Sequence, residues 1–194
     1  MQSEKELINL AKTNPLVFGE LYDAHYPRIF SYVYRLTGDH ALAGDIAAET
    51  FLKAFVRIGT FQWRGISISS WFFRIATNEV NQYFRKRTYL PERLTDLSTY
   101  DAAAWADRHA LRQESNETIR GIEAYQEFEH LRRLLLTLPE KYRQVIALRF
   151  FEELSIREIG EILGKKEGTV KSLLSRGLGK LKKMMTGAAT NPAI

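Results

Sequence analysis

Apolar residues recur at intervals of three and four along most of this chain, which is the spacing of amphipathic α-helices. No stretch shows strict alternation bounded by turn residues, so the pattern predicts no β-sheet. Between residues 88 and 118 the helical spacing gives way to small polar and turn-forming residues. The sequence therefore predicts an all-α protein made of two small helical domains joined by a flexible acidic linker.

The predicted boundaries follow the pattern and the charge together. We place an N-terminal helical bundle at residues 1–90, the linker at residues 91–120, a C-terminal helix-turn-helix domain at residues 121–186 and a disordered tail at residues 187–194. Between Pro91 and Thr118, six acidic residues stand against three arginines, whereas seven basic residues stand against one glutamate between Lys165 and Lys183. The net charge of +5 is thus concentrated outside the linker, which is typical of a protein with a polyanionic partner.

Residues 155–183 carry the signals of two helices joined by a short turn. Ser155 and Glu158 predict a capping box, and Gly164 predicts a left-handed helix end. Small Gly160 fits a close crossing of the two helices. The second helix is predicted to begin near residues 167–169 and to pack by an apolar stripe that comprises Val170, Leu174, Leu178 and Leu181. This pattern favours a helix-turn-helix, whose second helix enters the DNA major groove.

The opposite side of the second helix and of its start is polar and basic. We predict that it reads duplex DNA through Lys166, Thr169, Lys171, Ser172, Ser175 and Arg176. The alternative is a helical hairpin with a solvated basic face.

Residues 61–87 combine aromatic, amide and basic side chains in a loop followed by a helix. Amides can pair with base edges, and a basic cluster can hold phosphates. The candidate DNA-binding residues are Trp63, Arg64, Asn78, Asn81, Gln82, Arg85, Lys86 and Arg87. We expect Trp71 and Phe72 in the core and the helix to be capped by Ser69 or Ser70.

Residues 45–58 predict an amphipathic helix with an apolar face that comprises Ala48, Phe51, Leu52, Phe55 and Ile58. Asp45, Glu49 and Lys53 recur at intervals of four on its polar side. The simplest interpretation of these charges is a solvated face with a Glu49–Lys53 ion pair.

Residues 138–183, "LPEKYRQVIALRFFEELSIREIGEILGKKEGTVKSLLSRGLGKLKK", resemble the C-terminal region of bacterial RNA polymerase sigma factors of the extracytoplasmic-function (ECF) group, within the sigma-70 family. Residues 18–55, "FGELYDAHYPRIFSYVYRLTGDHALAGDIAAETFLKAF", and residues 69–87, "SSWFFRIATNEVNQYFRKR", resemble the N-terminal region of the same group. The order and spacing of these segments make the resemblance specific.

The resemblance implies a sigma factor that directs promoter-specific transcription initiation. Its C-terminal domain would read the upstream promoter element as duplex, and its N-terminal domain would capture the melted downstream element as a single strand. The implied partners are promoter DNA, an anti-sigma factor and core RNA polymerase, through its β′ clamp helices and β flap. Asp45, Glu49 and Lys53 become candidates for docking to the clamp helices. Leu173, Gly177 and Gly179 depart from the family pattern.

Other classes of function find little support in the sequence. The chain has no cysteine and four scattered histidines, so we expect no catalytic residues, no metal site and no cofactor. It shows neither a signal peptide nor a run long enough to cross a membrane, which predicts a cytoplasmic protein without membrane insertion. The remaining alternative is a stand-alone helix-turn-helix repressor or activator that does not act through core polymerase.

Overall fold

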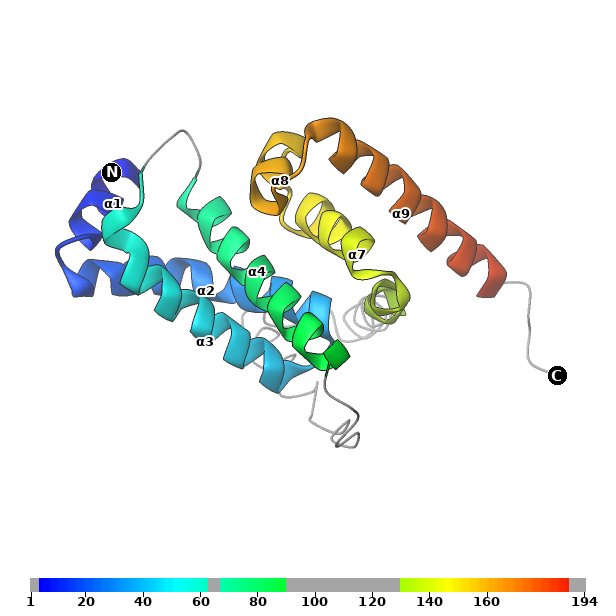
Figure 1. The fold of residues 1–194 in the computed structure, drawn as a ribbon, viewed down its shortest axis with the longest axis horizontal. Helices are drawn as coiled ribbons and strands as arrows, with labels where there is room; N and C mark the ends of the chain where they lie inside the picture. The colour runs from blue at the N-terminus through cyan, green and yellow to red at the C-terminus, as the bar shows by residue number, and fades with distance from the viewer. Residues whose placement is uncertain (1–3, 63–66, 90–129, 189–194) are drawn as a thin grey trace, which may run out of the picture.

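The N-terminal half is a bundle of helices. The computed structural model describes residues 4–62, 67–89 and 130–188. This half comprises α1 (Glu4–Ala11), α2 (Pro15–Thr37), α3 (His40–Arg57), the 3-10 turn η1 (Ile58–Thr60) and α4 (Ile68–Tyr89). Helices α2, α3 and α4 pack on one another, with α1 against α2 (Figure 1). The described residues contain helices and no strand, which confirms the all-α prediction.

Local sequence signals explain where these helices begin and end. The Asn14 side chain accepts a hydrogen bond from the Leu16 N–H at 3.0 Å, and Gly38 ends α2 with a φ of 72°. The next residue, Asp39, accepts from the Leu42 N–H at 3.0 Å and so caps α3. The expected cap of α4 by Ser69 or Ser70 is wrong. The Ser67 hydroxyl accepts from the Ser70 N–H at 3.1 Å, because the helix begins at Ile68, earlier than its apolar pattern suggests.

The C-terminal half contains the predicted helix-turn-helix. A helix over residues 130–137 precedes α7 (Glu140–Ile146), the π-helical turn η2 (Ala147–Phe151), α8 (Ile156–Leu163) and α9 (Glu167–Ala188). The capping box of Ser155 and Glu158 is present, and Gly164 has a φ of 62°. A Cβ atom at Gly160 would lie 2.7 Å from the Lys165 carbonyl oxygen. Only glycine therefore allows the turn to approach α8 so closely.

Helix α9 packs by most of its predicted stripe. Val170, Leu174 and Leu181 are buried, whereas Leu178 is 39% exposed. Leu173, which departs from the family pattern, is half-buried and packs against the core. The helix continues to Ala188, two residues beyond the predicted domain boundary. The rest of the predicted tail and the predicted linker lie outside the described residues.

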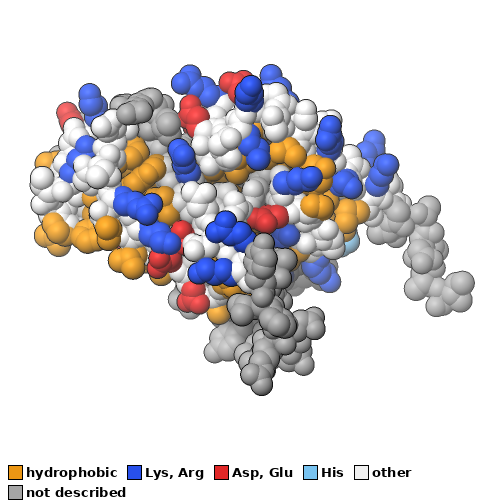
Figure 2. Space-filling view, in the orientation of Figure 1, with side chains coloured by type: hydrophobic (Ala, Val, Ile, Leu, Met, Phe, Trp, Pro, Cys, Tyr) orange, Lys and Arg blue, Asp and Glu red, His pale blue; other side chains and the backbone are white. Residues whose placement is uncertain are grey.

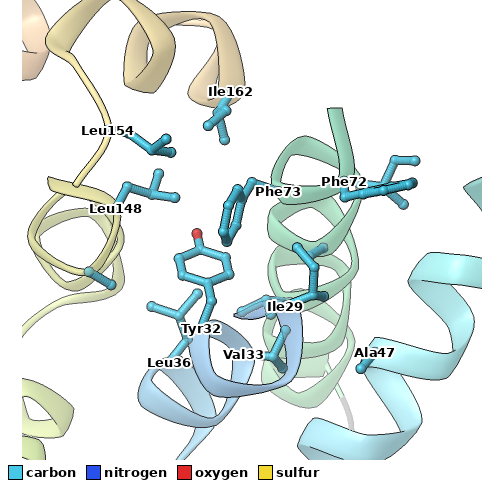
Figure 3. Close-up of a cluster of buried hydrophobic side chains, with 14 of the residues drawn as sticks. Ile29, Tyr32, Val33, Leu36, Ala47, Phe72, Phe73, Leu148, Leu154 and Ile162 are labelled. Atoms are coloured by element: carbon cyan, nitrogen blue, oxygen red, sulfur yellow. The ribbon is translucent and has the colours of Figure 1, made fainter. Parts of the chain in front are cut away.

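One apolar core joins the two halves. Helix α4 packs on α8, and α2 packs on η2 and α7. Figure 3 shows Tyr32 of α2 and Phe73 of α4 directed toward Leu148, Leu154 and Ile162 of the C-terminal half. Tyr32 and Phe73 are completely buried, and the Tyr32 hydroxyl is hydrogen-bonded to the Thr77 hydroxyl at 2.8 Å. The two predicted helical units thus pack together in a closed arrangement, which the sequence pattern did not address.

Candidate nucleic-acid and partner interfaces

The polar face of α9 is open to solvent. All six residues predicted to read duplex DNA are exposed on α9 or at its start, and they are Lys166, Thr169, Lys171, Ser172, Ser175 and Arg176. Within the described part of the chain, no carboxylate forms an ion pair with Lys171 or Arg176. Figure 2 shows many Lys and Arg side chains over the surface formed by α8 and α9. This face therefore presents free cations and short polar side chains, as a groove-reading helix requires.

The candidate residues of α4 lie next to the C-terminal half. Asn78, Asn81, Arg85 and Lys86 are exposed and Gln82 is half-buried. A cavity of about 300 Å³ separates this part of α4 from α7 and α8, and its walls include Asn78, Asn81, Glu140, Lys141, Gln144 and Lys165. Trp63 and Arg64 lie outside the described residues, as does the side chain of Arg87. The structure thus brings the two asparagines together on one face.

A side-chain hydrogen bond crosses that cavity. Gln144 donates through Nε2 to Asn81 Oδ1 and also to Glu140 Oε1, the latter at 2.8 Å. Burial raises the pKa of Glu140, while the Arg143 guanidinium acts in the opposite direction. Asn81 is therefore already bonded to the other half of the chain, whereas the structure gives Asn78 no such contact across the described residues.

The aromatic residues around the start of α4 belong to the core. Phe72 is completely buried, as predicted, and Phe61 is 8% exposed. Trp71 is half-buried, with its ring centroid 4.8 Å from that of Phe61 and 5.7 Å from that of Phe72. Trp71 is therefore packed largely as the pattern indicated.

The face of α3 that carries Asp45 and Glu49 is partly apolar. Leu52, Phe55 and Val56 are 57%, 43% and 74% exposed. The sequence placed Ala48, Leu52 and Phe55 on one apolar face with Phe51 and Ile58. That prediction is wrong, because Phe51 and Ile58 are buried whereas the other three residues are exposed. The small residues of α3 face the bundle instead, because they allow close packing of helices; they are Ala43, Ala47, Thr50 and Ala54. Buried Thr50 satisfies its hydroxyl by donating to the Ile46 carbonyl oxygen at 2.7 Å.

Lys53 has a structural role that its spacing did not reveal. Its ammonium group lies 3.1 Å from Glu49 Oε1, as predicted, and 2.6 Å from Glu79 Oε2 on α4. The hydrogen bond to Glu79 raises the pKa of Lys53. Burial has a smaller, opposing effect, and the hydrogen bond to Glu49 raises this pKa further. Lys53 therefore connects α3 to α4, while Asp45 remains exposed.

A buried carboxylate holds the two halves together. Glu152 follows η2, and its side chain is 4% exposed. Arg28 Nε lies 3.2 Å from Glu152 Oε2, and Arg35 Nη1 lies 3.2 Å from Glu152 Oε1. Arg28 also donates to the Glu152 carbonyl oxygen. We refer to Arg28, Arg35 and Glu152 as the interface ion cluster.

The electrostatics of the interface ion cluster reflect its burial. Desolvation raises the pKa of Glu152, and the Arg35 and Arg28 guanidinium groups act against it. Burial also lowers the pKa of Arg35. Sequence inspection missed this cluster because both arginines are more than a hundred residues from Glu152 in the sequence, and neither arginine stands in a local motif.

Further contacts join the end of α2 to the C-terminal half. Arg143 donates to the Leu36 carbonyl oxygen, and Arg132 donates to that of Gly38 at 3.4 Å. These arginines satisfy carbonyl groups at the C-terminus of α2, where a cation is favoured.

The described residues show no feature of a metal centre or a membrane segment. No group of three or more His, Asp or Glu side chains among them could hold a metal ion. None of their helices is long and apolar enough to cross a bilayer.

Comparison with known proteins identifies the class to which this fold belongs. Residues 21–89 match the family model of sigma-70 region 2, and residues 128–181 match that of sigma-70 region 4. The chain is 33% identical over 191 residues to the ECF RNA polymerase sigma factor SigW of Bacillus subtilis, with 95% of this chain and 97% of that protein covered. It is 30% identical to the ECF sigma factor BldN of Streptomyces coelicolor, with 93% and 65% covered.

The solved structures agree in fold. CnrH in complex with the cytosolic domain of CnrY matches with a TM-score of 0.67 and 20% identity, covering 96% of this chain and 99% of that chain. The sigma factor RpoE of Bartonella quintana, in complex with the anti-sigma factor NepR, matches with a TM-score of 0.66 and 21% identity, covering 87% and 96%.

The chain belongs to the ECF sigma factors of the sigma-70 family. Its family assigns it to promoter-directed initiation of transcription by RNA polymerase.

Proposed function

We propose that this sigma factor reads the upstream promoter element as duplex DNA with α9 and captures the melted downstream element as a single strand with α4. The observation that carries the first part is the exposed polar face of α9 opposite its buried stripe. Lys171 and Arg176 would contact the groove and the phosphates, while Lys166 and Thr169 approach the backbone from the start of the helix.

Strand capture is supported by the side chains along α4. Asn78 and Asn81 supply amides for base edges, and Arg85 and Lys86 supply charge for phosphates. Gln82, Trp63, Arg64 and Arg87 complete the proposed set. Extruding a base costs a few kcal/mol, which such contacts can offset without a nucleotide cofactor.

Docking to core polymerase is proposed for the exposed face of α3. Asp45 and Glu49 lie beside Leu52 and Val56, a combination of apolar contact area with charged residues at its edge. Such a composition is typical of protein interfaces. The β′ clamp helices are the proposed partner of this face, and the β flap that of the C-terminal half.

We propose an anti-sigma factor as a further partner. Two proteins of the same fold support this: RpoE was solved in complex with an anti-sigma factor, and CnrH in complex with the cytosolic domain of CnrY. Purification of the chain from its native cells tests this directly. Recovery of polymerase subunits alone would count against it.

The deciding experiment for the function is transcription in vitro with purified core polymerase. The double variant Lys171→Ala with Arg176→Ala should lose promoter-specific transcripts while its affinity for core polymerase stays within about twofold. The matched control, Lys5→Ala with Lys12→Ala, removes the same charge from α1 and the turn that follows it, and should retain both activities. Loss of core polymerase binding in the α9 variant would contradict the assignment of Lys171 and Arg176 to DNA. Regulation of transcription by a protein that does not bind core polymerase would favour a stand-alone regulator.

A further inference from the structure

The first turn of α4 takes one of its hydrogen-bond partners from near the start of the chain. The Ile68 N–H donates to Glu4 Oε1 at 2.9 Å, although Glu4 stands 64 residues earlier, in the first turn of α1. The Ser67 hydroxyl accepts from the Ser70 N–H at 3.1 Å. Figure 1 shows α1 at the same end of the bundle as the start of α4. Two N–H groups that a helix start leaves without helical partners are thus satisfied, one locally and one by a distant carboxylate.

The sequence of α4 itself lacks an acidic residue at this end. Its first turn contains no Asp or Glu. Helix α8 shows the usual local solution, because Glu158, the third residue of that helix, accepts from the Ser155 N–H at 2.8 Å. The third residue of α4 is Ser70. Glu4 therefore supplies from α1 the carboxylate that the N-terminus of a helix favours.

The enclosure of the start of α4 makes this bond difficult for water to replace. Ile68 and Ser70 are each 1% exposed. A backbone N–H that is buried without an acceptor costs free energy comparable to a lost hydrogen bond. Isoleucine and serine also favour the helix less than alanine or leucine do. Without the Glu4 carboxylate, we therefore expect the first turn of α4 to fray.

The start of α4 is also the anchor of the segment that leads into it. Trp63 and Arg64, which belong to the proposed capture set, precede Ser67 by four and three positions in the sequence. At about 3.5 Å per residue, their backbone can reach no further than roughly 14 Å from Ser67. Asn78 follows Ile68 on the same helix, about 15 Å along its axis. Along the chain, the first turn of α4 thus lies between the two groups of residues proposed to hold the melted strand.

We propose that Glu4 is a positioning residue for strand capture, which fixes the first turn of α4 from α1 and so holds both groups of residues in place for the melted strand. This inference rests on the proposed role of α4. Ile8 and Ala11 are buried and anchor α1 to the bundle, so a fixed helix presents the Glu4 carboxylate. Glu4 precedes residue 21, where the match to sigma-70 region 2 begins. Strand capture therefore depends on a helix that lies before the matched region.

Hydrogen exchange at the Ile68 amide tests the bond in the full chain. Glu4→Ala removes the acceptor and should speed exchange of this amide roughly tenfold, as loss of a helix cap allows. Glu4→Gln keeps an acceptor oxygen without the charge, so exchange should stay within about threefold of the wild-type rate. The matched control is Glu20→Ala, which removes the same side chain from the exposed surface of α2, where the described residues give it no ion pair. This control should leave exchange at Ile68 unchanged.

The functional measurement is the rate of open-complex formation with core polymerase. On a duplex promoter, Glu4→Ala should lower this rate about fivefold, and Glu4→Gln should recover most of it. On a promoter with a pre-melted bubble the loss should be less than about twofold, because the cost of unpairing is removed. Affinity for core polymerase should stay within about twofold in both variants, whereas a general loss of structure would lower it together with the rate.

Three results overturn the positioning role of Glu4. They are unchanged exchange at Ile68 in Glu4→Ala, a defect in Glu4→Gln as large as that in Glu4→Ala, and normal open-complex formation by Glu4→Ala when Asn78→Ala impairs it. In the third case, strand capture by α4 stands without Glu4. If Asn78→Ala and Glu4→Ala both leave open-complex formation intact, the proposed role of α4 falls, and the inference falls with it.

Discussion

Gly177 of α9 lies directly against Tyr142 of α7: a Cβ atom at Gly177 would come within 3.2 Å of Tyr142 Cβ and 3.1 Å of Ile146 Cδ1. The second glycine of the same helix, Gly179, has no atom within 4 Å of such a position. The two departures from the family pattern on α9 therefore have different physical consequences. Gly177 permits the close packing of α9 on α7, whereas Gly179 only lowers helix propensity.

Alanine substitutions should separate these effects. Gly179→Ala should raise the free energy of unfolding by about 1 kcal/mol, because alanine favours the helix and nothing opposes it. Gly177→Ala gains the same helix propensity, but its new methyl group must displace Tyr142 Cβ. We therefore expect the free energy of unfolding to stay unchanged or to fall by about 1 kcal/mol. Urea unfolding of both variants checks this, and equal stabilisation would contradict the packing role of Gly177.

Glu153 offers a different stabilising substitution. It has a φ of 58°, in the left-handed region that side chains other than glycine adopt at a cost. Because Glu153 is exposed, Glu153→Gly should raise the free energy of unfolding by roughly 0.5–1 kcal/mol. Lys182→Gly, in exposed α9, should instead lower it by about 1 kcal/mol. Destabilisation by both glycines would show that the turn after η2 does not carry this strain.

The role of α4 in strand capture predicts a dependence on the state of the template. Asn78→Ala should impair open-complex formation on a duplex promoter more than on a promoter with a pre-melted bubble, because the bubble removes the cost of unpairing. Ser172→Ala, on the proposed duplex-reading face, should lower initiation similarly on both templates. Abortive-transcript assays measure both. Equal loss for Asn78→Ala on the two templates would argue against a role in melting.

Asp45 and Lys53 share a helix face but should respond differently to substitution. Lys53→Met breaks the bond to Glu79 and should lower the free energy of unfolding by roughly 1 kcal/mol. Asp45→Ala should change stability by less than about 0.5 kcal/mol and weaken core polymerase binding. Binding of labelled core polymerase, measured beside urea unfolding, distinguishes them. A binding defect for Lys53→Met without loss of stability would show that Lys53 docks to core polymerase, as the sequence predicted.

The stability of the N-terminal half should depend on pH through His25. Burial, together with the positive charge of Arg28, lowers the pKa of His25, whose ring packs against Phe72 at 5.2 Å. Folded His25 therefore binds a proton less readily than His25 in the unfolded chain. The contribution of neutral His25 to stability is present above about pH 6.5 and is lost as the pH falls toward the lowered pKa. Unfolding at about pH 7.5 and about pH 5.5 should show a larger loss for the wild type than for His25→Gln. Identical losses would contradict this.

Local signals in the sequence predicted the helix-turn-helix well. Ser155, Glu158 and Gly164 act through neighbours in the chain, so their capping roles can be recognised from spacing alone. The faces of α3 were harder to assign. Small Ala47 and Thr50 are buried while larger Leu52 is exposed, because close helix packing outweighs side-chain hydrophobicity there.

Contacts between the halves had no local signature. In the sequence, Glu152 is one acidic residue in a charged stretch. Arg28 and Arg35 have the spacing of ordinary surface cations on a helix. Their partnership depends on how two helical units pack, which residue spacing does not encode. The residues of α9 proposed to read duplex DNA could be chosen from the sequence because their exposure depends on local spacing alone. They lie opposite the buried stripe of the same helix.

The core that Tyr32 and Phe73 share with Leu148 and Ile162 also bears on how the protein is made. During synthesis the N-terminal helices leave the ribosome first, and Ile162 follows Phe73 by roughly ninety residues, which corresponds to about ten seconds at typical elongation rates. For that interval the nascent bundle displays the aromatic surface that the C-terminal half later covers. We therefore expect the half-made chain to be a client of ribosome-associated chaperones, and truncated products ending near residue 90 to aggregate unless a partner takes the place of α8.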